Sequence, residues 1–217
     1  MCYTITMAIA LDFSFARPSI DSIKAAGVST VIRYLTGQGK AIDAAELHSY
    51  LDAGISVVFV YENTADDAAG GYNAGHANAL DAQGALYNLG MDPAFTPPVY
   101  FAVDTSVNPQ DAVPYFQGLS TAFGPSTLGV YGEGALCETL SSLGLCRWFW
   151  QSESTSFPGN STTLPITHLQ QKFDASPVPD TDLNIMCKPD VGQMPRPSPP
   201  KPPQTPPYHN NILLLNS

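Results

Sequence analysis

The chain has 217 residues, of which 44% are hydrophobic, so it can bury the core of one domain but not of two full-sized ones. Nineteen acidic residues against nine basic ones give a formal net charge of −10, which disfavours nucleic acid and anionic membrane surfaces as partners. No stretch approaches the roughly 20 apolar residues that span a bilayer, and residues 1–13 lack the basic region and cleavage site of a secretory signal. We therefore expect one domain with no membrane span and no visible signal peptide.

The first two thirds of the chain alternate between apolar, β-prone runs and helix-like segments. The predicted strands cover residues 7–12, 30–34, 55–62, 99–104 and 128–131, and the predicted helices cover residues 18–26, 43–53, 68–89, 109–123 and 133–143. Pro18 suits the first position of a helix, and Gly27 suits its end. Continuous apolar runs that are separated by helices are typical of a buried parallel sheet.

The helices stop after a sixth predicted strand at residues 147–151. Residues 152–165 are rich in Ser, Thr, Gly and Pro, and only residues 167–173 and 182–186 look like further strands. About eight mainly parallel strands predict an α/β fold, an irregular (β/α) TIM-type barrel without helices in its second half. The alternative is an open doubly wound sheet, but its Gly-rich phosphate loop is absent, because residues 12–19 read DFSFARPS. Nucleotide binding is therefore disfavoured.

The composition changes abruptly at Lys188. Nine of the twenty prolines fall between Pro189 and Pro207, which excludes a helix or a central strand there. We predict a barrel domain over residues 1–187, followed by a disordered, Pro-rich tail over residues 188–217.

Four carboxylates mark strand ends. Asp12, Glu62 and Asp104 each finish a predicted strand, and Asp182 begins the last one. In a β/α barrel, the side chains at the carboxyl ends of the strands converge on one rim, where active sites lie. For each acid the alternative is a helix cap or a surface loop. Clustered carboxylates favour acid/base chemistry, and glycosidic cleavage in particular needs a protonated and an ionised carboxyl group.

Aromatic and amide side chains accompany these acids. Flat rings beside amide groups suit a carbohydrate cleft, although ordinary core packing is the alternative for each of them. The predicted substrate-binding residues are Tyr34, Tyr61, Tyr131, Trp150, Gln151 and Gln171. Arg33 interrupts an apolar run, and we expect it to pair with an acid at the rim or inside the barrel.

Other chemistries lack their signals. The histidines show no i, i+4 pair and the four cysteines show no C-x-x-C spacing, so we expect no metal and no cofactor. Cys137 and Cys146 are either buried free thiols or a disulfide, which their spacing does not decide. A G-x-S-x-G nucleophile elbow is also absent.

Over about residues 7–187 the chain resembles the glycoside hydrolase-like TIM barrel domains related to family 25 lysozymes. The matching segments are ALDFS, TVIRYLTG, VVFVYEN, PVYFAVD, GVYGEG, LQQKFD and DTDLNI. The resemblance implies a barrel that acts on or binds β-1,4-linked amino-sugar polymers such as peptidoglycan, as a monomer outside the cell or at the cell wall. It matches the family's acids to Asp12, Asp104 and Asp182.

One position departs from the lysozyme pattern. Those lysozymes carry two acids on the fourth strand, two residues apart, and Ala102 stands where the partner of Asp104 would be. We infer that Glu62 substitutes for it. The first hypothesis is thus a glycoside hydrolase with Asp104 as general acid, Glu62 or Asp12 as the ionised partner, and Asp182 orienting the substrate. The alternatives are a catalytically impaired carbohydrate-binding barrel and a barrel enzyme for small metabolites.

Overall fold

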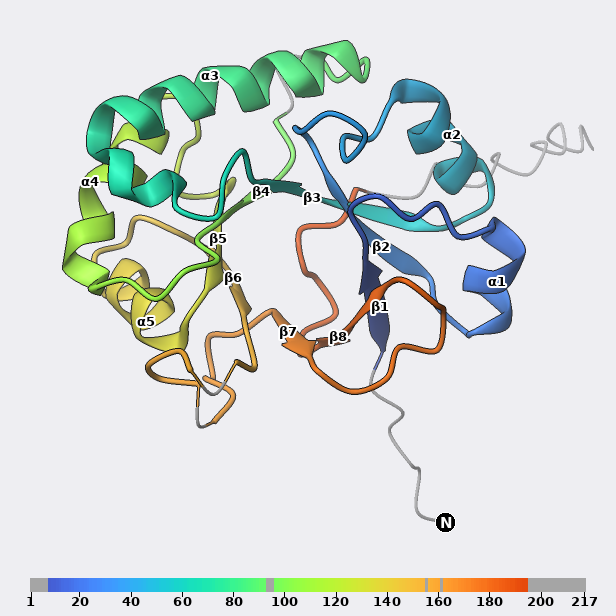
Figure 1. Ribbon diagram of the computed structural model, residues 1–217. Coiled ribbons are helices and arrows are strands. Elements are labelled where there is room, and N and C mark those ends of the chain that lie inside the picture. The colour runs from blue at the N-terminus through green and yellow to red at the C-terminus, as the bar shows by residue number, and fades with distance from the viewer. Residues whose placement is uncertain (1–7, 93–95, 155, 161, 195–217) are drawn as a thin grey trace, which may run out of the picture.

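Eight strands close into a barrel in sequence order, from β1 to β8 (Figure 1). A computed structural model describes residues 8–92, 96–154, 156–160 and 162–194. The strands are β1 Ile9–Asp12, β2 Thr30–Tyr34, β3 Ser56–Tyr61, β4 Val99–Ala102, β5 Leu128–Gly132, β6 Trp148–Gln151, β7 Leu169–Lys172 and β8 Asp182–Met186. Neighbours from β1 to β7 pair in parallel, whereas β8 runs antiparallel to both β7 and β1. The predicted TIM-type barrel is confirmed.

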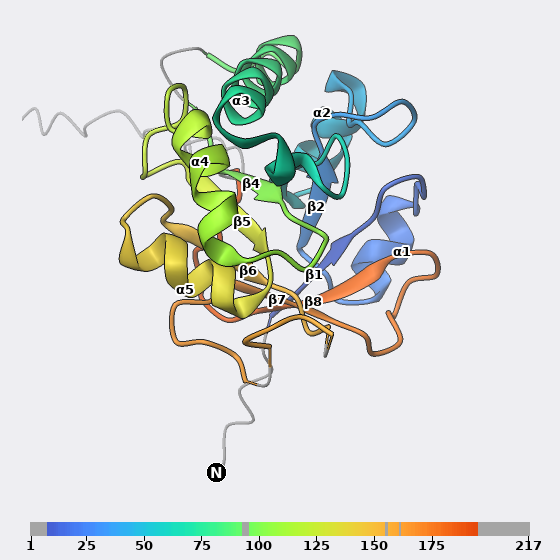
Figure 2. The ribbon, with the colours of Figure 1, turned by 60° about the vertical axis from the view of Figure 1, so that its left-hand side comes forward.

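Each of the first five strands is followed by an α-helix. These are α1 Ile20–Ala25, α2 Ala44–Asp52, α3 Gly71–Asn88 after the short 3-10 helix η1 Asp67–Gly70, α4 Pro109–Leu119 and α5 Gly134–Ser142. Local signals fix their starts, since Ser19, Asp43 and Asn108 each accept a hydrogen bond from a backbone N–H of the first turn. Helices α3, α4 and α5 cover one flank of the barrel (Figure 2).

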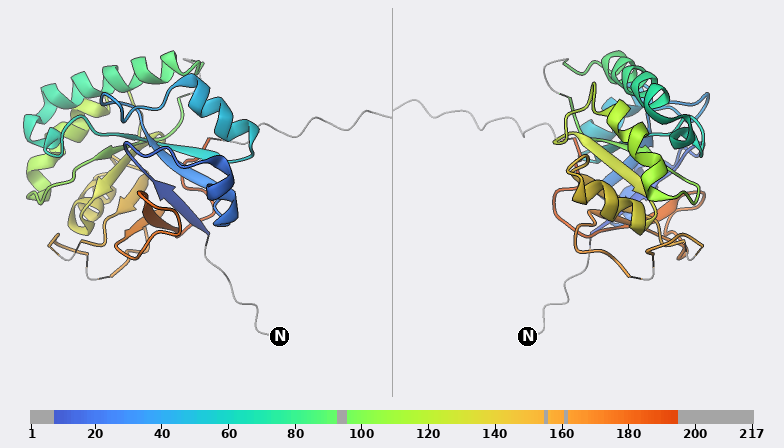
Figure 3. Two further views of the ribbon diagram at one scale, coloured as in Figure 1. Left: turned by 45° about the vertical axis from the view of Figure 1, so that its right-hand side comes forward. Right: turned by 90° about the vertical axis from the view of Figure 1, so that its left-hand side faces the viewer.

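The second half of the barrel has loops in place of helices. Among the described residues after α5, no α-helix occurs, and β6, β7 and β8 are joined by long irregular segments (Figure 3). This part of the prediction is also confirmed. No helix in the described part of the chain is long and apolar enough to cross a membrane.

Alternate residues of each strand face two separate cores. Inward-facing side chains such as Ile32, Val60 and Trp150 fill the barrel, whereas outward-facing ones such as Val31 and Phe59 pack against the helices. The parallel strands are apolar on both faces, which is why they read as continuous apolar runs in the sequence. Cys137 and Cys146 are both free, buried thiols in the outer core.

The described chain continues in contact with the barrel beyond residue 187. Val191 is fully buried in the inner core, and its carbonyl oxygen accepts a hydrogen bond of 2.9 Å from Tyr100 Oη. The backbone N–H of Met194 donates to Val57 O at 2.8 Å. Residues 188–194 thereby close the end of the barrel opposite the carboxyl ends of the parallel strands. The rest of the predicted tail, residues 195–217, lies outside the described residues.

Candidate active site

A small polar pocket opens where the carboxyl ends of the parallel strands meet. Its volume is about 110 Å³. Ten residues line it, namely Asp12, Tyr34, Val60, Glu62, Ala102, Asp104, Tyr131, Trp150, Gln171 and Asp182. All four acids predicted from the strand ends are therefore brought together.

The alternation of side chains along each strand explains this convergence. Asp12, Glu62 and Asp104 lie two residues beyond Ala10, Val60 and Ala102, which all face the inside of the barrel. Asp182 reaches the same rim although it begins its strand, because β8 runs antiparallel and pairs Asp182 directly with Asp12. The direction of β8 thus delivers the fourth carboxylate.

Asp12 lies at the bottom of the pocket. It is 2% exposed, and its Oδ2 accepts a hydrogen bond of 2.6 Å from Asn184 Nδ2. Burial raises the pKa of Asp12 to about 7, and the negative charge of Asp182 adds to this rise, while the hydrogen bonds from Asn184 and Gln171 oppose it. Below neutral pH, Asp12 therefore holds a proton in a site that already contains other acids.

Asp104 and Glu62 occupy contrasting environments. Burial raises the pKa of Asp104, and the nearby Glu62 carboxylate raises it further. Glu62 instead forms an ion pair, because Lys40 Nζ lies 2.7 Å from its Oε2. The Lys40 ammonium also lies 4.7 Å from the centre of the Tyr34 ring, which helps to hold it beside Glu62. The pocket thus combines a carboxyl group whose pKa is raised by burial with an ion-paired carboxylate.

Aromatic and amide groups complete the pocket lining. Tyr131 Oη donates to Gln171 Oε1 at 2.5 Å and lies 3.5 Å from Asp104 Oδ1. Trp150 packs against the Tyr131 ring, with 4.5 Å between the centroids, and donates through Nε1 to Asn184 Oδ1 at 2.8 Å. Burial raises the pKa of both Tyr34 and Tyr131, so both phenols remain neutral hydrogen-bonding groups.

A family model for the Rv2525c-like, glycoside hydrolase-like domain matches residues 21–185, which is most of the chain. The chain belongs to this family. No curated protein sequence matches it.

Solved structures share the barrel of this glycoside hydrolase-like family. The Tat-secreted protein Rv2525c of Mycobacterium tuberculosis is 25% identical, with a TM-score of 0.77 over 87% of this chain and 99% of that one. The autolysin LytC of Streptococcus pneumoniae is 14% identical, with a TM-score of 0.55 over 85% of this chain and 47% of that one. The catalytic domain of the endolysin ply40 from Listeria bacteriophage P40 is 19% identical, with a TM-score of 0.52 over 87% and 96%. The last two similarities concern the fold alone.

Three residues that we predicted to contact substrate in this glycoside hydrolase-like barrel point away from the pocket. Arg33 is fully buried between β2 and α2, where its Nε lies 2.7 Å from Glu46 Oε1. Tyr61 Oη donates to Asp81 Oδ2 on α3 at 2.9 Å. Gln151 donates through Nε2 to Thr162 O at 2.9 Å, and its Oε1 accepts hydrogen bonds from the same loop.

The three side chains face away from the pocket for one shared reason. Each residue occupies an outward-facing position of its strand, and its neighbour in the sequence faces inward. Arg33 stabilises the contact between strand and helix, and Gln151 organises the loop before β7. Arg33 does pair with an acid, as predicted. However, this acid is Glu46 on α2, which lies neither at the rim nor inside the barrel.

Two side chains that contact the acids of the pocket were not predicted from the sequence. Lys40 comes from the loop between β2 and α2, and Asn184 lies inside the barrel on β8 and joins Asp12 to Trp150. Asn184 belongs to the segment DTDLNI, two residues after Asp182, so the alternation of β8 was the signal that could have identified it. No local signal marked Lys40, which the β2–α2 loop brings to Glu62 from 22 residues away.

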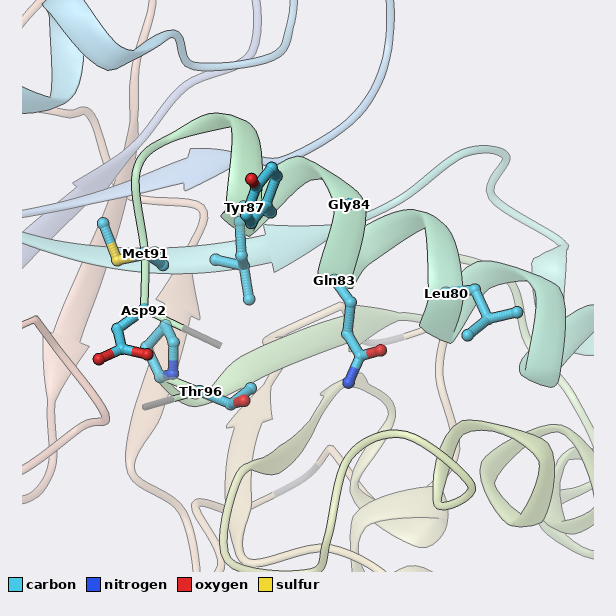
Figure 4. Close-up of a pocket in the computed structure, with 9 residues that line it drawn as sticks. Leu80, Gln83, Gly84, Tyr87, Met91, Asp92 and Thr96 are labelled. Carbon is cyan, nitrogen blue, oxygen red and sulfur yellow. The ribbon is translucent and has the colours of Figure 1, made fainter. Parts of the chain in front are cut away.

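A second, larger pocket lies elsewhere on the molecule. It has a volume of about 390 Å³ and lies between the end of α3 and the start of β4, with Tyr87, Met91 and Pro97 in its mostly apolar wall (Figure 4). Of its described lining residues, Asp92 alone carries a carboxylate. No group of three or more His, Cys, Asp or Glu in the described part of the chain could hold a metal ion. The carboxylate pocket at the rim is therefore the candidate active site.

Proposed function

We propose that this barrel hydrolyses glycosidic bonds in peptidoglycan or a related β-1,4-linked amino-sugar polymer by carboxylate acid/base catalysis. The observation that carries the proposal is that Asp104 and Glu62 share one pocket in contrasting environments, because burial raises the pKa of Asp104 whereas Glu62 is ion-paired with Lys40. Glycoside hydrolysis requires two carboxyl groups with different roles, one as acid and one as base or nucleophile. Environments that move the pKa values of two acids apart indicate which acid takes which role.

Each acid receives a role from its surroundings. Asp104 donates its proton to the leaving glycosidic oxygen, because its raised pKa keeps the carboxyl group protonated to a higher pH. Glu62, which forms an ion pair with Lys40, attacks the anomeric carbon or activates the water that does so. Asp182 orients the substrate at the rim. Asp12, buried beneath them, orients the sugar through hydrogen bonds, or takes the place of Glu62 as the ionised partner once it loses its proton above about pH 7.

The comparisons support the substrate class and the location. LytC is an autolysin that has been solved with a synthetic peptidoglycan ligand, and ply40 is an endolysin. Rv2525c is a Tat-secreted protein. By analogy, we infer that this chain acts as a monomer on glycan outside the cell or at the cell wall.

A second candidate function is glycan binding without cleavage. Ala102 lines the pocket at the position where the related lysozymes carry a second acid, so the fourth strand supplies one carboxylate instead of two. In this alternative, the remaining acids, Tyr131 and Gln171 bind a sugar through hydrogen bonds, and no glycosidic bond is broken.

One experiment separates the two candidates. Purified peptidoglycan is incubated with the wild type, with Glu62→Gln, and with the control Glu138→Gln, which removes an exposed acid on α5, outside the pocket lining. We expect the wild type and the control to release new reducing ends, and Glu62→Gln to lose about 10²- to 10⁴-fold in rate. Binding of the wild type to the polymer without any new reducing ends would reject hydrolysis in favour of the binding barrel. Neither binding nor cleavage would reject both.

A further inference from the structure

Two phenylalanine side chains stand exposed at the rim on either side of the strand that carries Asp182. Phe15 is 68% exposed and lies three residues beyond Asp12, in the loop after β1. Phe173 is 69% exposed and lies two residues beyond Gln171, directly after β7. Because β8 lies between β7 and β1, the two residues follow the carboxyl ends of the strands on either side of the one that carries Asp182.

The backbone around Phe15 is held in place. Arg17 Nη1 donates to Ser14 O and to Ala16 O, at 2.8 Å in both cases, and so binds the residues on both sides of Phe15. Arg17 Nη2 also reaches Gly39 O at 3.1 Å, in the loop that carries Lys40. A side chain at Gly39 would approach the Phe15 ring to 3.6 Å, so the ring leans over this loop. The exposed ring is thus presented from an ordered position beside the pocket.

Phe173 is presented in a similar way from the opposite side. Its backbone N–H donates to Glu153 Oε2 at 3.3 Å, and Glu153 also pairs with Lys172. These contacts anchor the chain where β7 ends. An ordered aromatic ring that remains exposed costs hydration free energy, and it gains a favourable contact only when a ligand covers it.

The size of the pocket requires a second binding surface for a polymer. A volume of about 110 Å³ is smaller than the ~150 Å³ of an apolar cavity that binds one benzene molecule, so the pocket admits no more than one sugar ring. The neighbouring rings of a polymer must then lie across the mouth. The flat, apolar face of a pyranose ring matches the face of an aromatic side chain.

We propose that Phe15 and Phe173 are stacking subsites for the sugar rings next to the one held at the acids. The inference rests on the proposed function and extends it, because it makes the ligand an extended chain of sugars rather than a single residue. Isolated apolar side chains are common on protein surfaces, and Tyr87 on α3 is as exposed as Phe15. Their position after the carboxyl ends of β1 and β7, the two strands next to β8, distinguishes the two phenylalanines.

The test is the dependence of affinity on chain length. Titration calorimetry measures binding of β-1,4-linked N-acetylglucosamine dimers and hexamers to the wild type, Phe15→Ala, Phe173→Ala and the matched control Tyr87→Ala. We expect each phenylalanine variant to bind the hexamer about 3- to 10-fold more weakly, with dimer binding unchanged. Tyr87→Ala should match the wild type, and Phe15→Trp and Phe173→Trp should keep hexamer affinity. Thermal melting confirms that each variant is folded, which its exposed position favours.

The outcomes separate this inference from the function on which it rests. Unchanged hexamer affinity in both alanine variants, with a wild type that still cleaves peptidoglycan, overturns the subsites alone. An equal loss of dimer and hexamer affinity would also overturn them, because it would mean that the rings act on the pocket itself. A wild type that neither binds the oligomers nor cleaves peptidoglycan removes the proposed function, and the subsites with it.

Discussion

Asp12 shows how a candidate catalytic residue can reduce the stability of its own fold. It lies fully inside the barrel, facing Asp182 across the strand pair. Its pKa rises from an ordinary value of 3.8 to about 7 because burial penalises the charged carboxylate. Below about pH 4 both the folded and the unfolded chain hold the proton. As the pH rises to 7, the unfolded chain loses it first, so folding becomes less favourable.

We predict that Asp12→Asn stabilises the protein at high pH. The free energy of unfolding should exceed that of the wild type by up to about 4 kcal/mol at pH 8, and the difference should vanish near pH 4. Urea denaturation across this pH range measures it. Asp52→Asn, at an exposed position at the end of α2, is the control and should show no such trend. A difference that does not depend on pH would contradict the account of Asp12.

Lys40 affects Asp104 as well as Glu62. Its positive charge lowers the pKa of Asp104, in opposition to burial and to the Glu62 carboxylate. Removing this charge should therefore raise the pKa of Asp104 further. We predict that Lys40→Met moves the basic limb of the pH–rate profile to higher pH, because the general acid then keeps its proton longer.

The control for Lys40 is Lys24→Met, which removes an exposed lysine on α1, outside the pocket lining. Its pH–rate profile should coincide with that of the wild type. If the basic limb of Lys40→Met stays in place or moves to lower pH, Asp104 is not the group that titrates there.

At the scale of elements, helices α3 and α4 meet through two glycines. A Cβ at Gly75 would lie 2.0 Å from Tyr115 O, and a Cβ at Gly118 would lie 2.1 Å from Tyr72 O. Both clashes involve backbone atoms, which can be relieved only by moving a helix. The two helices cover the same flank of the barrel (Figure 2), so their separation would disturb the outer core beneath them.

We predict that Gly75→Ala and Gly118→Ala each destabilise the fold by about 1–3 kcal/mol. The matched control is Gly84→Ala on the same helix α3, where nothing lies within 4 Å of the added methyl group. This substitution should stabilise by about 0.5–1 kcal/mol, since alanine favours a helix over glycine. Thermal melting of the three variants measures the contrast. Equal melting temperatures would mean that the helices are not in close contact.

The sequence predicts the elements well but not the face on which each side chain lies. Helix ends were marked by local signals, such as Asp43 at the start of α2. The strands are apolar on both faces, so their composition does not reveal which residues point inward. The acid at the end of the strand does reveal it. Glu62 faces the pocket, so its neighbour Tyr61 must face the helices, and the same counting places Arg33 outside because Tyr34 lies inside.

At the scale of the whole molecule, the antiparallel β8 could have been predicted from the connection that precedes it. Residues 173–181 join β7 to β8, which is shorter than the dozen or more residues that a parallel crossover needs. This direction explains why Asp182 joins the acids at the rim. By contrast, the contact between Lys40 and Glu62 depends on a loop conformation that no sequence pattern specified.

Residues 188–194, which close the end of the barrel opposite the carboxyl ends of the parallel strands, provide a test of where the folded domain ends. We predict that a chain that ends at residue 187 is less stable by about 2–4 kcal/mol than a chain that ends at residue 194, because it loses the buried Val191 and the hydrogen bonds to Tyr100 and Val57. Urea denaturation of the two chains measures the difference. Equal stability would place the end of the folded domain at residue 187.

The central claim is that the carboxylates at the rim break a glycosidic bond. The most direct measurement is the initial rate of reducing-end release from purified peptidoglycan by the wild type and by Asp104→Asn, with the exposed Asp111→Asn on α4 as control. We predict that the wild type and the control release reducing ends at equal rates and that Asp104→Asn is slower by about 10²- to 10⁴-fold. A rate for Asp104→Asn equal to that of the wild type, or no release by the wild type, would contradict the account.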